Sequence, residues 1–456
     1  MNVNALINKL INFFKVNLLS IIGILIFGLG ETELIKVMQI YSLGRRGKLA
    51  LLILFLMLFC FVVHWYKTIC KETSMKIIFM IILALTIYIR ISMFKYMSGD
   101  YIDYLKVWID KMRQYPGVES LGKNIGNYNP PYMYILFIIS KFKMHSLYLI
   151  KYVSTVFDYL IAIYVFKMIS KFTGEKSLLP FISFFAFLCL PTVILNSAMW
   201  GQCDSIYASF CLMGLYYTLN NKKYLGIILF STAFCFKLQS IFILPIILVF
   251  IFKGEYNIKH LILFPITFFI ELLPDILCGR PLNEVFMIYF NQADYVKILS
   301  ANSPSLYSLV DNTSSNYEAL YLPSLLVAAT VMLLFICLIY LFKDALENRK
   351  YIEICFVLTL IIPYLLPKMH DRYFYLAEVF ALLYVCLNKK KWYILPMTVA
   401  ASLLAYRNYL FLERESCFAL RLGSTMLLIV IVLTFKDVVY DELIYGHSEI
   451  SKHKRI

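Results

Sequence analysis

The stretch LPKMHDRYFY, residues 366–375, places four ionisable side chains between two long apolar runs. Lys368, His370, Asp371 and Arg372 lie between YIEICFVLTLIIPYLL and YFYLAEVFALLYVCL. A charge at membrane depth costs about 2.5–3.5 kcal/mol, so three cations and one acid in one place predict an anionic partner. Lysine supplies a point charge and arginine a two-donor fork, which suit a phosphate at the bilayer surface. A mutual network of ion pairs is the alternative.

A second group of polar residues follows the apolar run that ends near residue 94. In GDYIDYLKVW, Asp100 stands directly after the expected helix end and Asp103 three residues later. A carboxylate fixed there can act as a general base that takes the proton from a sugar hydroxyl as the hydroxyl attacks. The alternative is a solvated loop charge. Asp103 is a second acid, a substrate contact or a residue without a function.

Two further constellations combine amide, acid and cation. AMWGQCDSIY carries Trp200, Gln202 and Asp204, and FKLQS carries Lys237 and Gln239, both at junctions of apolar runs. Trp200 is predicted to stack on a sugar face, while Gln202 and Asp204 hydrogen-bond its hydroxyls or help hold a metal. Lys237, with Gln239 beside it, is predicted to meet an anion. The structural alternatives are an interfacial tryptophan, an aspartate that caps the next helix and a lysine that reaches to the membrane surface.

The rest of the chain must position these groups within a membrane. Of 456 residues, 61% are hydrophobic and 17% aromatic, and the mean hydropathy of +0.75 excludes a water-soluble globule. The net charge of +15 comes from short lysine and arginine clusters between apolar runs, a pattern of membrane topology and not of nucleic-acid binding. The eleven cysteines form no CxxC pair, so neither a disulfide framework nor a zinc site is indicated.

Apolar runs predict an all-α polytopic membrane protein of about 12–14 transmembrane helices. The runs cover roughly residues 11–29, 49–66, 76–94, 147–170, 178–198, 205–219, 224–238, 240–252, 260–276, 323–342, 351–366, 373–388, 393–406 and 422–436. Between the third and fourth runs, Pro130 and Pro131 begin an amphipathic stretch that is predicted to lie in the outer interface.

Lysine-rich connections alternate along the chain with the polar constellations. The clusters within 67–76, 167–176, 222–223, 253–259, 343–350, 389–391 and 452–455 fall on one face, which the positive-inside rule makes cytoplasmic. Arg45, Arg46 and Lys48 fall on the other face, which indicates either an unusual first hairpin or a segment 11–29 that does not span. The candidate site residues are therefore expected at the extracytoplasmic face of a multi-pass protein of the cell membrane.

One acid, Asp158, lies inside the expected span 147–170. Lys151 is seven residues earlier and so lies close to the same helical face. A structural ion pair, or a contact with another helix, is expected there instead of chemistry.

Two classes of membrane protein fit acids, aromatics and cations gathered at one face. The first is an integral membrane glycosyltransferase that uses a lipid-phosphate-linked sugar, and the second is a multi-spanning transporter or flippase of lipid-linked saccharides. Transporters place charges near the bilayer midplane, on broken helices in matched halves. Here the polar groups collect at one surface and the sequence shows no internal symmetry, which favours the enzyme.

Six motifs together resemble bacterial GT-C glycosyltransferases related to the mannosyltransferases of GPI-anchor assembly. In order they are GDYIDYLKVW, NYNPPYMYIL, AMWGQCDSIY, CFKLQSIF, YFNQADYVKILSANSPSLYSL and LPKMHDRYFY. Dolichyl-linked glucosyltransferases and protein mannosyltransferases are more distantly similar. The specific elements are WGQxD and MHxRY, although the family commonly has Glu where this chain has Asp371. The resemblance covers roughly residues 76–390, with a hydrophobic N-terminal hairpin in 1–75 and C-terminal helices with a basic tail in 391–456.

The resemblance implies a GT-C-type bundle whose extracytoplasmic first loop carries interfacial helices. It implies an inverting transfer of a mannose- or glucose-like hexose from a polyprenyl-phosphate-linked donor, in the assembly of cell-surface polysaccharide or glycoconjugates. The acceptor is expected to be a glycan or a lipid-linked molecule. Protein mannosyltransferases usually show a paired acid where this chain has Gly99 and Asp100, so a protein acceptor is the lesser expectation. The bilayer is the other partner, no cofactor is assigned, and a divalent cation is left open.

Matching positions carry the family's roles onto this chain. By resemblance Asp100 is the base, and Gln202 with Asp204 belongs to the sugar pocket. Lys237, His370 and Arg372 belong to the donor phosphate by the same resemblance. Asn302, in the ANSPSLY segment, matches a family position with no assigned role.

Overall fold

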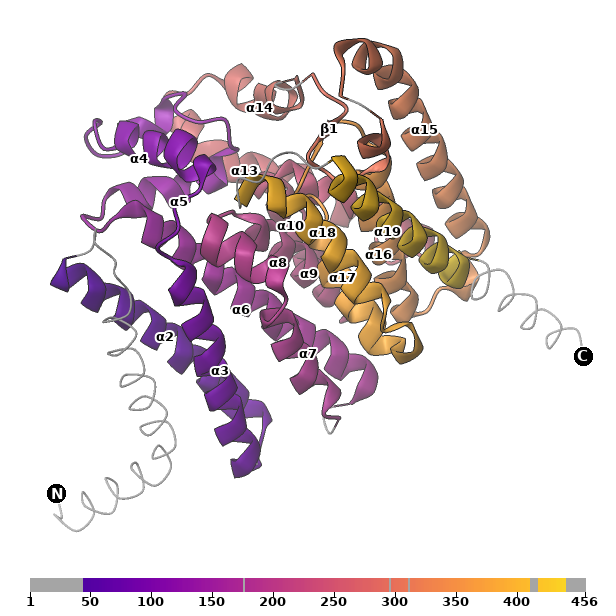
Figure 1. The fold of residues 1–456 in the computed structure, drawn as a ribbon, viewed down its shortest axis with the longest axis horizontal. Coiled ribbons are helices and arrows are strands. Elements are labelled where there is room, and N and C mark those ends of the chain that lie inside the picture. The colour runs from indigo at the N-terminus through magenta and orange to yellow at the C-terminus, as the bar shows by residue number, and fades with distance from the viewer. Residues whose placement is uncertain (1–43, 175–176, 295–296, 311, 411–416, 440–456) are drawn as a thin grey trace, which may run out of the picture.

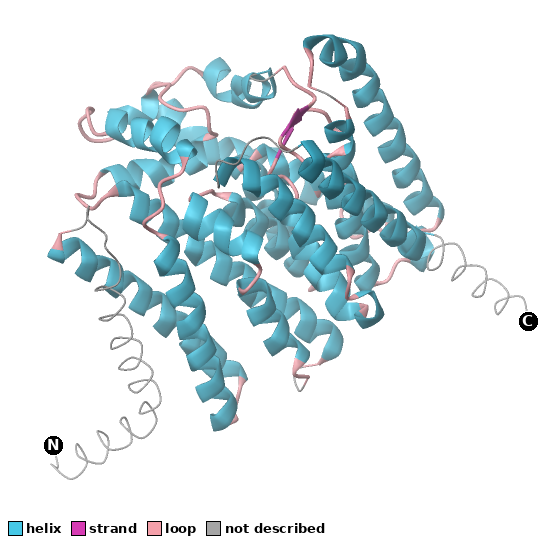
Figure 2. Ribbon diagram, in the orientation of Figure 1, coloured by secondary structure: helices cyan, strands magenta, loops and turns pink. Residues whose placement is uncertain are grey.

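The structure, a computed structural model, is almost entirely α-helical (Figure 2). It describes residues 44–174, 177–294, 297–310, 312–410 and 417–439. The expected first span, 11–29, and the basic tail at 452–455 lie outside the described residues.

Helices follow one another with short connections along the described chain (Figure 1). Those before residue 240 are α2 (Arg45–Ile69), α3 (Thr73–Met93), α4 (Lys106–Met112), α5 (Pro130–Ser140), α6 (Ser146–Thr173), α7 (Leu179–Leu188), α8 (Pro191–Ile194), α9 (Asp204–Leu219) and α10 (Lys223–Phe236). Those after it are α11 (Ile246–Phe252), α12 (Ile258–Leu261), α13 (Leu263–Leu277), α14 (Leu282–Asp294), α15 (Ser314–Leu341), α16 (Asn348–Leu365), α17 (Tyr375–Leu387), α18 (Ile394–Leu410) and α19 (Cys417–Phe435). Two short strands, β1 (Ser300–Ala301) and β2 (Met369–His370), complete the fold.

Six helices of the described chain are long and apolar enough to cross a membrane. They are α2, α3, α6, α15, α19 and the continuous α12–α13 segment. The predicted run 178–198 is instead a pair bent by 47°. The bend falls before Pro191, whose ring and missing N–H interrupt a helix. The chain is thus an all-α polytopic membrane protein, and because several other apolar runs form helices shorter than a full span, the count of 12–14 spans stays a prediction.

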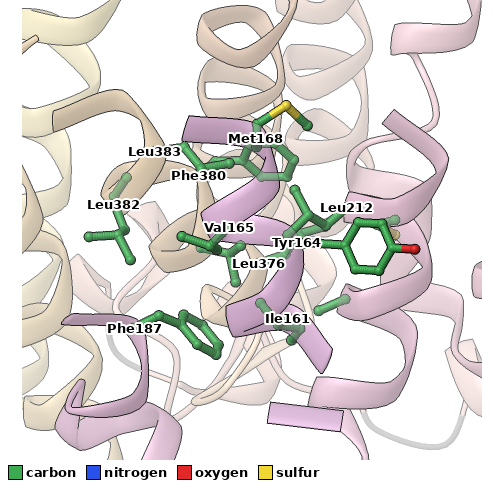
Figure 3. Close-up of a cluster of buried hydrophobic side chains, with 14 of the residues drawn as sticks. Ile161, Tyr164, Val165, Met168, Phe187, Leu212, Leu376, Phe380, Leu382 and Leu383 are labelled. Carbon is green, nitrogen blue, oxygen red and sulfur yellow. The ribbon is translucent and has the colours of Figure 1, made fainter. Parts of the chain in front are cut away.

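The helix α6 forms the centre of the bundle. Its apolar segment is 72% buried, whereas that of α15, at the edge of Figure 1, is only 22% buried. The ridge of α6 faces the apolar side chains of α17 in the core (Figure 3). Side chains labelled there are Ile161, Tyr164, Val165 and Met168 of α6, Phe187 of α7, Leu212 of α9, and Leu376, Phe380, Leu382 and Leu383 of α17. Packing of α17 on α6 therefore fixes the loop that precedes α17.

The two ends of the bundle differ in character. At one end, in Figure 1, lie α4, α14 and the strand β1. At the other end lie the turn between α2 and α3, the end of α6 and the start of α7. The sequence has Lys67, Lys71 and Lys76 around the first of these and Lys167 and Lys171 near the second. The polar constellations and the lysine-rich connections thus separate to opposite ends, as the alternation along the sequence predicts.

A buried ion pair joins α3 to α6. Arg90 Nε donates to Asp158 Oδ2 at 3.0 Å, and both side chains are completely buried. Ser197 Oγ donates to the same oxygen at 2.5 Å. The predicted pairing of Asp158 with Lys151 is wrong, because the Lys151 ammonium donates to backbone carbonyls at the end of α3. The alternative, a contact with another helix, is confirmed.

This pair gives a test of the packing between α3 and α6. An Asp158→Ala protein leaves Arg90 buried without its carboxylate and is expected to lose about 3–5 kcal/mol of unfolding free energy. Replacing both residues by leucine removes both charges and is expected to cost clearly less. Thermal unfolding of the purified proteins in one detergent compares them, and equal losses in the two variants would contradict the buried pair.

Candidate active site

The chain leaves α3 in a fixed direction because a buried lysine holds its last carbonyls. Lys151 Nζ of α6 donates to the carbonyl oxygens of Phe94 at 3.1 Å and Tyr96 at 2.5 Å. Two residues later, Ser98 Oγ donates to the carbonyl of Trp200 at 2.8 Å. These contacts tie the segment that follows α3 to the WGQxD segment and place Asp100 between them.

Three side chains donate hydrogen bonds to the carboxylate of Asp100. Tyr409 Oη donates to Oδ1 at 2.8 Å, and Trp200 Nε1 donates to Oδ2 at 2.9 Å. Gln202 Nε2 donates to Oδ2 at 2.5 Å. The side chain of Asp100 stays 21% exposed. The donors come from two different segments far from Asp100 in sequence, so the carboxylate has a fixed orientation and still faces solvent.

Two glycines make this approach possible. A Cβ at Gly99 would lie 2.8 Å from Tyr409 Oη, so a side chain there would force the tyrosine hydroxyl to shift away from its present position. Gly201 has a φ of 80°, which a residue with a Cβ rarely adopts. It ends the π-helical turn Leu195–Trp200, a rare element that is frequent at functional sites. The turn directs Gln202 back toward Asp100.

Arg372 lies over the indole ring of Trp200, with Cζ 5.2 Å from the ring centroid. Three carboxylates surround its guanidinium at longer distances. Asp371 Oδ1 is 3.4 Å from Nη1, Asp100 Oδ2 is 3.8 Å from Nη1, and Asp204 Oδ2 is 3.8 Å from Nε. Only the contact with Asp371 is a hydrogen bond, and the buried Nε has no hydrogen-bond partner among the described residues. Arg372 therefore keeps donors that an oxyanion can use.

Asp204 is the internal counterion of the site. Asn196 Nδ2 donates to its Oδ2 at 2.8 Å, and Lys237 Nζ pairs with its Oδ1. The predicted alternative, a helix cap, is wrong, because α9 begins at Asp204 itself and Cys203 occupies the capping position. Asp204 is almost completely buried and positions Lys237 instead of facing the cavity.

Strand pairing brings two distant loops together. The strands β1 and β2 are parallel, with Ala301 opposite His370, and Asn302 forms a further bridge to His370. Asn302 has a φ of 58°, a left-handed conformation that asparagine tolerates better than most residues. The ANSPSLY segment therefore lies against the MHDR segment.

One cavity of about 810 Å³ joins these parts. Eight of the predicted site residues line it, namely Asp100, Gln202, Lys237, Gln239, Asn302, His370, Asp371 and Arg372. Aromatic side chains also line it, among them Tyr104, Trp108, Tyr128, Tyr132 and Tyr289. We call this space the Asp100 cavity. Such a volume accommodates a sugar with part of a lipid chain, and a polar group set beside an aromatic wall is typical of ligand sites.

Besides Asp204, three other predicted site residues do not line the cavity. Asp103 is exposed and does not line the Asp100 cavity. Trp200 is completely buried, and Tyr409 stacks on its ring at 4.8 Å, so it supports Asp100 and Arg372 and has no open face for a sugar. Lys368 has its Nζ 4.7 Å from the ring centroid of Tyr321 on α15 and does not line the cavity.

Burial changes the charges that the sequence predicts. It lowers the pKa of His370 to about 4, with Arg372 and Lys237 adding to the effect, so the ring is neutral at pH 7. His370 can donate an N–H to a phosphate but brings no charge, contrary to its prediction as a cation. Burial also raises the pKa of Asp371 to about 7, although the neighbouring Arg372 opposes the shift. The cavity thus holds fewer cations than the sequence predicts and an acid that titrates near neutrality.

Two residues of the site carried no sequence signal strong enough to select them. Tyr409 provides a hydrogen bond to Asp100 from 309 positions away. Asn196 holds Asp204 from within an apolar run. Tyr409 lies just beyond the expected end of the run 393–406, where the topology predicted from the lysine clusters puts the outer face, and that position was its only indication.

Metal binding finds little support in this set. Among the described residues, no group of three or more His, Cys, Asp or Glu side chains is placed to hold a metal ion. Asp204 is paired with Lys237, and Asp100 already accepts three hydrogen bonds.

A scan against models of protein families and a search of curated proteins found no match to this chain. The motifs and the geometry of the site are therefore the features that indicate a function.

The titration of Asp371 predicts a pH dependence for anion binding. Above pH 7 the ionised carboxylate competes for Arg372, and below pH 7 the protonated acid releases it. If an anion binds only when Asp371 is protonated, its affinity is expected to fall about tenfold from pH 6 to pH 8. A phosphodiester ligand does not titrate in this range. The affinity for the anion, measured at pH 6 and pH 8, should be independent of pH in an Asp371→Asn protein. A variant that shows the same fall in affinity as wild type would contradict the assignment to Asp371.

Proposed function

We propose that this chain is an inverting GT-C-type glycosyltransferase. It moves a hexose from a polyprenyl-phosphate-linked donor to a glycan or lipid-linked acceptor at the extracytoplasmic face. The main support for the proposal is the arrangement of Asp100 and Arg372 in the Asp100 cavity. A carboxylate, Asp100, is oriented by three hydrogen bonds at the wall of a large cavity, with the partly satisfied guanidinium of Arg372 within 3.8 Å.

In the proposed reaction the acceptor hydroxyl binds against Asp100. Its oxygen attacks the anomeric carbon as Asp100 takes the hydroxyl proton, and the bond from that carbon to the phosphate oxygen breaks. The electron pair of the broken bond stays with the lipid phosphate, and the new glycosidic bond has inverted configuration. Arg372 and Lys237 stabilise the charge that develops on the phosphate.

Inversion sets a geometric condition on this site. The base and the leaving phosphate must lie on opposite sides of the anomeric carbon. Because Arg372 is within 3.8 Å of Asp100, donor binding must draw the guanidinium away from that carboxylate. Arg372 makes one hydrogen bond, to Asp371, and its contacts with Asp100 and Asp204 are longer, at 3.8 Å, so the donor phosphate would have to replace these carboxylates as its partner.

The walls of the Asp100 cavity fit the two parts of such a donor. Aromatic side chains such as Tyr104 and Trp108 present apolar faces against which a sugar ring or a prenyl chain can pack. The amide oxygen of Gln239 is buried and has no hydrogen-bond partner within the described part of the chain, so it can accept from a sugar hydroxyl. The rival class, a transporter or flippase, would leave the lipid-linked saccharide chemically unchanged.

The decisive experiment uses purified full-length protein in nanodiscs. A panel of polyprenyl-phosphate hexoses is offered with glycan and lipid-linked acceptors, and the released polyprenyl phosphate and the product linkage are analysed. The proposal expects consumption of a lipid-linked donor and an inverted product. Exclusive use of a nucleotide sugar without lipid would refute the donor assignment. Movement of intact donor across the bilayer without hydrolysis or transfer would favour the flippase.

A further inference from the structure

A second cavity of about 640 Å³ opens at the far end of the bundle. The ends of α6 and α17 and the starts of α7 and α16 surround it. Its walls include the cations Arg349, Lys389, Lys390 and Lys391 and the apolar side chains of Phe172 and Leu179. We call it the lysine cavity.

The lysine cavity is separate from the Asp100 cavity. The helix α16 begins at the lysine cavity and ends before Arg372, and α17 runs back from that loop to Lys389. These helices have 18 and 13 residues, which correspond to lengths of about 27 and 20 Å. The two cavities therefore lie at opposite ends of one helical hairpin.

Two of the four cations that line the lysine cavity, Arg349 and Lys391, are paired with acids of the described chain, and the other two are not. Arg349 donates to the carbonyl of Leu387 at 2.9 Å and to Glu353 Oε1 at 3.3 Å. Lys391 Nζ lies 2.8 Å from Asp437. Lys389 and Lys390 are exposed and form no ion pair with a described carboxylate, and none of the described residues that line the cavity is acidic. The cavity therefore attracts an anion.

The apolar part of the wall decides which anion fits. Phe172, Leu179 and Leu387 stand beside the lysines, so the cavity offers both a polar and a lipid-like surface. Trp392 follows directly and is 68% exposed. An exposed tryptophan beside lysines is typical of the level of the lipid headgroups. A free phosphate ion would use only the cations, whereas a phospholipid would use the whole surface.

We propose that the lysine cavity binds the phosphate headgroup of an anionic phospholipid from the leaflet on that face. The phosphate contacts Lys389 and Lys390, and the start of an acyl chain packs against Phe172 and Leu179. Basic pockets between membrane helices bind such headgroups, and each lysine contributes roughly 1 kcal/mol. This lipid would hold the ends of the hairpin whose opposite end carries Arg372. The proposal is independent of the reaction at Asp100.

The test is lipid binding by the full-length protein in a nonionic detergent. Native mass spectrometry counts bound lipid during titration with phosphatidylglycerol, phosphatidylcholine or inorganic phosphate. Wild type is expected to bind phosphatidylglycerol well above phosphatidylcholine. A Lys389→Ala/Lys390→Ala protein is expected to lose about 30-fold in affinity for phosphatidylglycerol, from roughly 1 kcal/mol for each lysine.

A matched control is available on the same face. Lys222 and Lys259 are exposed lysines that do not line the cavity, and replacing both by alanine should leave the affinity unchanged. An equal loss in this control would show a general charge effect and overturn the site. Equal binding of the two phospholipids by wild type would overturn it as well. Phosphate that displaces the lipid at similar concentration would overturn the lipid assignment and leave only an anion site. Because the readout is binding, none of these outcomes depends on glycosyl transfer.

Discussion

An Asp100→Asn protein is expected to bind the lipid-linked donor about as well as wild type and to turn it over about 10²–10⁴ times more slowly. The amide has the shape of the carboxylate but cannot accept the proton of the attacking hydroxyl, and the loss of a general base has this magnitude. Its oxygen can still accept from Tyr409 or from Trp200, so most of the local arrangement persists. Donor binding and initial rates with one acceptor, measured on the same preparation, separate affinity from turnover.

Asp110→Asn is the matched control for this variant. Asp110 is an acid of α4, in the same segment between α3 and α5 as Asp100, and its exposed carboxylate pairs with Lys106 and Arg113. Its loss is expected to change stability by no more than about 0.5 kcal/mol and to leave turnover unchanged. Full activity in Asp100→Asn would end the assignment of the base. A folded Asp100→Asn protein that no longer binds donor would move Asp100 from proton transfer to substrate binding.

For Arg372→Lys we expect losses in both donor affinity and turnover. Lysine keeps the positive charge but lacks the planar two-donor fork, and it cannot rest flat on Trp200 as the guanidinium does. Removing one donor to a developing oxyanion typically costs about 10²–10³ in turnover. A charge-assisted clamp acts on the bound donor as well, so the donor affinity should fall about tenfold or more. Equilibrium binding and single-turnover rates measure the two effects.

The control is Arg113→Lys, which changes an exposed arginine that pairs with Asp110. It should retain donor affinity and rate. A turnover defect with unchanged affinity in Arg372→Lys would confine the arginine to stabilising the leaving group. If Arg372→Lys had the donor affinity and the single-turnover rate of wild type, Arg372 would not contact the donor. Its only role would then be in the internal network of ion pairs.

Most of the helices could be placed from the sequence alone. The expected runs 147–170, 205–219 and 373–388 correspond to α6 (Ser146–Thr173), α9 (Asp204–Leu219) and α17 (Tyr375–Leu387). Hydrophobic runs and their polar boundaries are local signals, because in a bilayer every backbone group must find its partner within the helix. The break before Pro191 was missed because the apolar run continues through it.

The composition of the site could be predicted in part. Motif positions selected eight residues that line one cavity, although they come from segments up to 272 positions apart, Asp100 to Arg372. Residue type and order were enough because each segment follows or precedes an apolar run whose end falls on the same face. The roles of these residues in transfer stay predictions.

The sequence by itself determined that the chain lies in a membrane, where most helices form and that the polar segments gather at one end of them. These properties depend on composition and on the alternation of apolar and polar runs along the chain. Tertiary structure decided which partner each charge meets. Asp158 pairs with Arg90 and not with Lys151, and Lys368 turns to Tyr321 while Arg372 lies on Trp200. It also decided protonation, since burial leaves His370 neutral and lets Asp371 titrate near pH 7. The physical reason is that pairing and desolvation depend on distances between helices, and those distances are set by packing of side chains that are remote in sequence.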